Sequence, residues 1–143
     1  MLERSLKTLP LRMRAHAEGA QAVAEYLQTH PKVSEVHYPG LPSHVDHALA
    51  RRLLNTMGGM IAFAVESDAA ALKLLGRLNL MRQATSLGGV ETLVSLPFNT
   101  SHAAYTTDQR SRLGIAPGCI RLSVGIEDPR DLIADLAQGL ATL

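Results

Sequence analysis

Hydrophobic and polar positions repeat along the chain with two different periods, which together predict a mixed α/β fold. From Leu9 to Thr29, apolar residues recur three and four positions apart, as they do on one face of a helix. From Met60 to Val65 and from Ile120 to Val124, the buried and outward positions alternate one by one, which is typical of a strand with one covered face. These three segments form the predicted framework.

Weaker patterns predict the remaining elements. We expect strands at Val33 to Tyr38, Leu78 to Met81 and Thr92 to Leu96, and helices at Asp46 to Leu54, Ala69 to Gly76 and Thr106 to Leu113. Asp128 can cap a final helix that has Pro129 at its first position. The buried stripe of that helix consists of Leu132, Ile133, Leu136 and Leu140. Because many connections are short, we predict a small, largely antiparallel sheet with helices on one face.

Composition and charge mainly exclude classes of partner and covalent links. The 143 residues carry a net charge of +1 with scattered Lys and Arg, and only 3% are aromatic, so nucleic acid is not an expected partner. The longest apolar run, Leu53 to Val65, is too short to cross a bilayer, so no membrane partner is expected. Cys119 is the single cysteine, which excludes an internal disulfide and suits a cytoplasmic location.

Arg121 is the first candidate for a functional side chain. Its strand neighbours Ile120, Leu122 and Val124 share the covered face, so Arg121 and Ser123 must point the other way. A guanidinium in an apolar strand is costly unless it meets an anion, and its planar fork matches a carboxylate. A solvated Arg on an open sheet face is the alternative that spacing alone leaves open.

The segment Ser86-Leu87-Gly88-Gly89 is the second candidate. Two glycines after a serine allow backbone N–H groups to approach an anion closely. A plain tight turn explains the same pattern, and no nucleophile elbow, phosphate-binding loop or dinucleotide fingerprint is present.

Other reactive residue types lack suitable companions. His44 and His47 flank Asp46, but a zinc site needs further ligands, so a turn and capping cluster is favoured and no metal is expected. Cys119 resembles a small core residue. The lysines, Lys7, Lys32 and Lys73, lie outside any apolar setting that would lower the pKa of an amine for Schiff-base chemistry. No catalytic residue is therefore predicted within this chain.

Four sequence motifs, in this order along the chain, carry a resemblance to a known enzyme family. They are R-S-L-K-T-L-P-L-R-M at 4–13, Y-P-G-L at 38–41, S-L-G-G-V-E-T at 86–92 and I-R-L-S-V-G-I-E-D at 120–128. Together they resemble the C-terminal part of the Cys/Met-metabolism family of pyridoxal-phosphate enzymes, which includes cystathionine synthases and lyases, methionine γ-lyase and O-acylhomoserine sulfhydrylases. Ser5 and Leu96 depart from residues common in the family, so the motifs do not select one activity.

The resemblance implies a fold and a site. The chain is similar to the small domain of aspartate-aminotransferase-like enzymes, with residues 1–30 as a long lead-in helix and 31–143 as the substrate-closing domain. By resemblance, Arg121 binds the substrate α-carboxylate, and Ser86 and Leu87 line the same site. The implied activity is that of a lyase or transferase in transsulfuration, acting on sulfur-containing or O-acylated amino acids.

The resemblance also implies what lies elsewhere. The family's Schiff-base lysine stands in a Ser-x-Thr-Lys stretch, which this sequence lacks. Pyridoxal 5′-phosphate is thus expected to be bound mainly by a large N-terminal domain, within a homo-oligomer that is a tetramer in the family. This chain alone is then inactive, and Met1 is an internal methionine of a longer reading frame or the start of a shortened chain. A stand-alone, non-catalytic module that binds amino acids or another subunit is the alternative.

Overall fold

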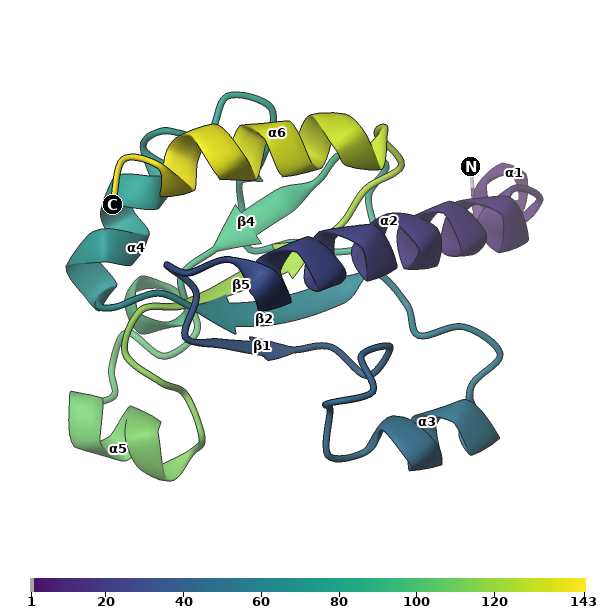
Figure 1. The fold of residues 1–143 in the computed structure, drawn as a ribbon. Helices are drawn as coiled ribbons and strands as arrows, with labels where there is room; N and C mark the ends of the chain where they lie inside the picture. Colours follow the sequence, from purple (N-terminus) through teal and green to yellow (C-terminus); the bar gives the residue numbers. More distant parts are fainter. Residues whose placement is uncertain (1) are drawn as a thin grey trace.

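The structure is a computed structural model that describes residues 2–143, and one mixed sheet lies at its centre (Figure 1). The strands are β1 (Glu35–His37), β2 (Met60–Ala64), β3 (Arg82–Gln83), β4 (Leu93–Ser95) and β5 (Cys119–Ser123). The helices are α1 (Leu2–Leu6), α2 (Leu9–Thr29), α3 (His47–Leu53), α4 (Asp68–Leu75), α5 (Thr107–Arg112) and α6 (Pro129–Leu140), with a 3₁₀ turn η1 at Pro97–Asn99.

The strand order in the sheet is β1-β2-β5-β4-β3. The pairs β1–β2, β2–β5 and β5–β4 are antiparallel, and only the edge pair β3–β4 is parallel. Helices α2 and α6 run side by side over one face, with α4 at one end of this layer (Figure 1). The prediction of a small, largely antiparallel sheet with helices on one face is confirmed.

The core lies between that sheet face and the helices. Ile61 pairs with Leu122 and Phe63 pairs with Ile120, and all four side chains are buried. The helices supply the other half of the core through Ala20, Val23, Ala24 and Leu27 of α2 and Leu132, Leu136 and Leu140 of α6. Burying a large apolar side chain of this kind stabilises the fold by roughly 1.5–3 kcal/mol. The alternating strands and the spacing of α2 therefore meet as the sequence predicts.

Side-chain caps fix where α4 and α6 begin, whereas α2 and α3 start without one. The Ser67 hydroxyl accepts a hydrogen bond from Ala70 N at the start of α4, and the Asp128 carboxylate accepts one from Arg130 N at the start of α6. Both caps satisfy a backbone N–H that has no partner inside its own helix. None of the described helices combines the length and apolarity that a membrane crossing needs.

The predicted strand from Leu78 to Met81 is wrong. In its place, the N–H groups of Asn79, Leu80 and Met81 all donate to the carboxylate of Asp135, which belongs to α6. These donors are therefore unavailable to a sheet ladder, and the edge strand begins only at Arg82.

Candidate functional site

Arg121 lies on the face of the sheet opposite to the helices. Its neighbours across the ladder are Ala62 on β2 and Ser95 on β4, both short side chains. The flanking Ile120 and Leu122 are fully buried on the helix side. The predicted orientation of Arg121 is confirmed, and the small residues beside it leave room for its guanidinium.

The guanidinium of Arg121 is held by main-chain carbonyls of a distant loop. Its Nη2 donates to Thr85 O at 2.6 Å and to Ser86 O at 3.0 Å. Its Nε is buried and has no hydrogen-bond partner among the described residues. Carbonyl dipoles compensate the half-buried cation only in part, because no anionic side chain pairs with it within the described part of the chain. Nη1, like Nε, has no hydrogen-bond partner among the described residues, and it is the nitrogen we expect a ligand to reach, because Nε is buried.

The loop of residues 84–92, between β3 and β4, supplies those carbonyls. The sequence left two readings of this loop open, a plain tight turn or N–H groups that bind an anion, and in the structure the start of the loop turns carbonyl oxygens toward Arg121. Gly88 has a φ of +72°, which favours glycine, and its N–H donates to the Ser123 hydroxyl at 3.0 Å. The loop therefore lies against the same sheet face as Arg121.

Ser86 is brought to the Arg121 side chain through its backbone carbonyl, whereas Leu87, the next residue of the loop, makes no hydrogen bond to Arg121 among the described residues. Both side chains are exposed, and Leu87 is 61% accessible. We call half-buried Arg121, together with exposed Ser86 and Leu87 of the 84–92 loop, the Arg121 site.

Two residues that hold this loop were not predicted as part of the site. Thr92 is fully buried at the end of the loop, and both its N–H and its hydroxyl donate to the Glu127 carboxylate. Both residues stand inside motifs that the sequence showed, S-L-G-G-V-E-T and I-R-L-S-V-G-I-E-D. Their pairing, however, needed the tertiary structure.

Comparison with known families matches residues 1–141 of the chain to "Cys/Met metabolism PLP-dependent enzyme". The chain belongs to this family. Its members depend on pyridoxal phosphate and include lyases and synthases of cysteine and methionine metabolism, as the resemblance of the four motifs implied.

Individual relatives of the Cys/Met-metabolism family match over nearly the whole chain. An L-methionine gamma-lyase of Pseudomonas deceptionensis is 44% identical over 100% of this chain, and a cystathionine gamma-lyase of Dictyostelium discoideum is 46% identical over 96%. The solved structure of cystathionine gamma synthase from Xanthomonas oryzae pv. oryzae, in complex with aminoacrylate and cysteine, superposes with a TM-score of 0.90 at 44% identity over 96% of this chain. The chain spans only 36% of the length of each of these three proteins.

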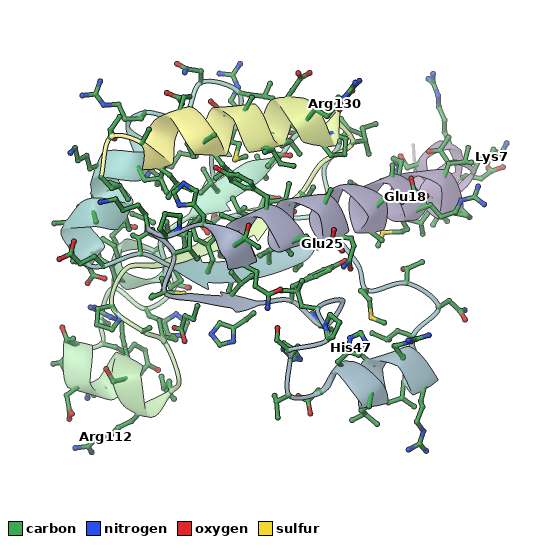
Figure 2. All side chains as sticks on the ribbon, viewed as in Figure 1. Lys7, Glu18, Glu25, His47, Arg112 and Arg130 are labelled. Atoms are coloured by element: carbon green, nitrogen blue, oxygen red, sulfur yellow. The ribbon has the colours of Figure 1, made fainter. Side chains whose placement is uncertain are left out.

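The lysines of this chain do not fit the Schiff-base position of the family's cofactor. A Schiff-base lysine needs an environment that lowers the pKa of its amine, but Lys7, Lys32 and Lys73 are all exposed. Lys7 lies between α1 and α2, at the N-terminal end of the molecule, and pairs with Glu3 at 3.5 Å (Figure 2). Lys73 donates to the carbonyl of Thr142. None of the three lies in the Arg121 site.

The remaining candidate residues have local structural partners. His47 Nδ1 lies 2.8 Å from Pro39 O, and His44 Nδ1 accepts from Asp46 N at 3.1 Å. Among the described residues, no group of three or more His, Cys, Asp or Glu could hold a metal ion. Burial is the largest cause that raises the pKa of the Cys119 thiol, which disfavours the nucleophilic thiolate.

Proposed function

We propose that this chain is the substrate-closing part of a pyridoxal-phosphate-dependent lyase or transferase of the transsulfuration type. Residues 1–30 form the lead-in helix and residues 31–143 the small C-terminal domain. The substrate is a sulfur-containing or O-acylated amino acid, and Arg121 binds its α-carboxylate. The single observation that carries the proposal is the guanidinium of Arg121, which lies on the sheet face opposite to the helices and whose Nη1 has no hydrogen-bond partner in residues 2–143.

The Arg121 site works by positioning. The carbonyls of Thr85 and Ser86 fix Nη2, so the guanidinium plane is already oriented before a substrate arrives. A carboxylate that accepts from Nη1 gains a charge-assisted hydrogen bond, and the rest of the amino acid is then fixed in direction. Holding a substrate in one geometry lowers the entropic cost of the reaction that follows.

In this proposal, pyridoxal phosphate is bound by a larger domain outside this chain, because no lysine of this chain fits the Schiff-base position. That domain, together with further copies in a homo-oligomer, is the expected partner of the chain, in the cytoplasm. The 36% share of its relatives' length supports this view. This chain by itself is expected to be inactive.

Replacing Arg121 tests the assignment. In the full-length enzyme that carries this chain, Arg121→Ala removes a charged donor, a loss of about 1.5–3 kcal/mol that corresponds to a KM roughly 10- to 100-fold higher. Arg121→Lys should recover only part of the affinity, since an ammonium lacks the planar fork. Steady-state kinetics with the amino-acid substrate measure both effects.

Arg51→Ala is the matched control, because Arg51 is an exposed arginine on α3, an element that contributes no residue to the Arg121 site. Its KM should equal that of the unmodified enzyme. An unchanged KM in Arg121→Ala would rule out Arg121 as the carboxylate receptor.

A further inference from the structure

The loop of the Arg121 site is tied at both ends to one short stretch of chain, residues 121–127. At its start, the carbonyls of Thr85 and Ser86 accept from Arg121 Nη2. At its end, Thr92 is bound by Glu127, which follows β5 by four residues. A cation thus holds carbonyl oxygens at one end, and an anion holds hydrogen-bond donors at the other.

The contact between Glu127 and Thr92 is bidentate. Glu127 Oε1 accepts from Thr92 N at 2.6 Å, and Oε2 accepts from the Thr92 hydroxyl at 2.8 Å. The same hydroxyl oxygen accepts from Gly125 N at 2.8 Å. Thr92 is fully buried, so these charge-assisted bonds face little competition from water.

The middle of the loop follows the same stretch of chain. Val90 O accepts from Ile126 N at 2.9 Å, and Gly88 N donates to the Ser123 hydroxyl at 3.0 Å. The two backbones approach so closely that a Cβ at position 125 would lie 2.3 Å from Val90 O. Only glycine permits this approach.

These contacts link the two charged residues mechanically. The orientation of the Arg121 guanidinium depends on where Thr85 and Ser86 place their carbonyls. The position of that loop in turn depends on its closing end, where the carboxylate of Glu127 binds Thr92. A change at Glu127 therefore reaches the guanidinium without touching it.

We propose that Glu127 is a positioning residue for substrate carboxylate binding, acting through Thr92 and the 84–92 loop on Arg121. The proposal rests on the function proposed above for Arg121. Glu127 does not touch the substrate in this proposal, and its effect passes entirely through the guanidinium.

Glu91 provides the matched control. It is a carboxylate on the same loop, next to Thr92 in sequence, but its side chain is exposed and accepts no hydrogen bond from the described residues. A general effect of removing negative charge from this region would appear in Glu91→Gln as well as in Glu127→Gln.

The kinetic test compares variants of the full-length enzyme. In Glu127→Gln, the side-chain amide nitrogen cannot accept from the Thr92 hydroxyl, so we expect KM to rise about tenfold with kcat changed less than about twofold, the loss of one hydrogen bond to a charged group. Thr92→Val should also raise KM. Thr92→Ser keeps the hydroxyl, so its KM should stay close to that of the unmodified enzyme. Glu91→Gln should leave both constants unchanged.

A double-mutant cycle with Arg121→Lys separates positioning from general stability. If Glu127 acts through Arg121, the combined rise in KM is smaller than the product of the two single rises. Independent effects, or a KM in Glu127→Gln equal to that of Glu91→Gln, overturn the proposal. If Arg121→Ala itself leaves KM unchanged, it is the proposed function of the Arg121 site that fails.

Amide hydrogen exchange on the 143-residue chain gives a readout free of catalysis. Glu127→Gln should speed exchange at Gly88 and Thr92 at least severalfold relative to Glu91→Gln, while exchange in α2 stays the same. Equal exchange in the loop of both variants would show that Glu127 does not hold it, and would overturn the proposal.

Discussion

Tyr38 illustrates at the scale of one residue how the fold fixes the protonation state of a side chain. Its ring is fully buried, and its hydroxyl donates to Gly58 O at 3.0 Å and to Ala17 O at 3.3 Å. Burial raises the pKa of this phenol from 10.0 to about 12. The folded state therefore keeps the proton at a pH where the unfolded chain has lost it.

The sign of the resulting pH effect follows from that difference. The stabilisation from neutral Tyr38 is complete below pH 10.0 and is lost as the pH rises toward about 12, by roughly 2 kcal/mol in the free energy of unfolding. Denaturant unfolding of the chain between pH 9 and pH 12 measures this slope. Tyr38→Phe starts from lower stability, because the hydrogen bond that the single hydroxyl proton shares between Gly58 O and Ala17 O is gone, but it should show a shallower loss. Parallel curves for the two proteins would contradict this account.

Arg121 marks what one residue's sequence context can reveal. Strict alternation around it correctly predicted the face on which it lies, since side-chain direction in a strand depends only on position. The sequence also led us to expect an anion beside it. The carbonyls that hold it belong to Thr85 and Ser86, which lie 36 and 35 positions earlier in the sequence. No local sequence pattern predicts such a contact.

At the scale of the element, the short helix α5 depends on one part-buried ion pair. Six residues cannot form a stable helix alone, and within α5 only Arg110 is buried. Arg110 Nη2 lies 2.8 Å from Asp68 Oδ2 at the start of α4, and Asp68 Oδ1 accepts from Gly118 N. The pair therefore joins α5, α4 and the approach to β5.

Arg110→Met should leave the half-buried carboxylate of Asp68 without its cation and lower the free energy of unfolding by about 2 kcal/mol, between the values typical of exposed and of buried pairs. The matched control is Arg112→Met on the same helix. Arg112 also pairs with an aspartate, Asp108, at 2.8 Å, but both side chains are more than 70% exposed, and Arg112 projects from the outer end of α5 (Figure 2). An exposed pair contributes no more than about 1 kcal/mol. Equal losses in chemical denaturation would show that burial of Arg110 is not decisive.

The elements that the sequence predicted well are those whose pattern is set by their own burial. Helix α2, strands β2 and β5 and helix α6 lie where the hydrophobic periods indicated. The segment from Leu78 to Met81 was predicted wrongly because Asp135, more than fifty positions later, takes its backbone donors. The parallel pairing of β3 with β4 was also unpredicted, because the loop between them is shaped by distant side chains.

At the scale of the whole molecule, the absence of a fitting lysine leads to a spectroscopic prediction. Lys7, Lys32 and Lys73 are exposed, and none lies in the Arg121 site. The purified 143-residue chain mixed with pyridoxal phosphate should form only the weak, reversible imine that free lysine forms at the same concentration. Absorption spectra after dialysis test this. A stable, stoichiometric imine band would contradict the view that the cofactor is bound elsewhere.

The order of strands in the sheet has a consequence for biosynthesis. Strand β5 is the last strand along the chain, yet it lies at the centre of the sheet, between β2 and β4. Until it emerges from the ribosome, the β1–β2 pair and the β3–β4 pair share no hydrogen bonds, and each presents an open edge to other nascent chains. A translation product that stops before Cys119 is therefore not a smaller version of this domain. It contains the β1–β2 pair and the β3–β4 pair without the strand that joins them, and we expect it to aggregate or to be degraded.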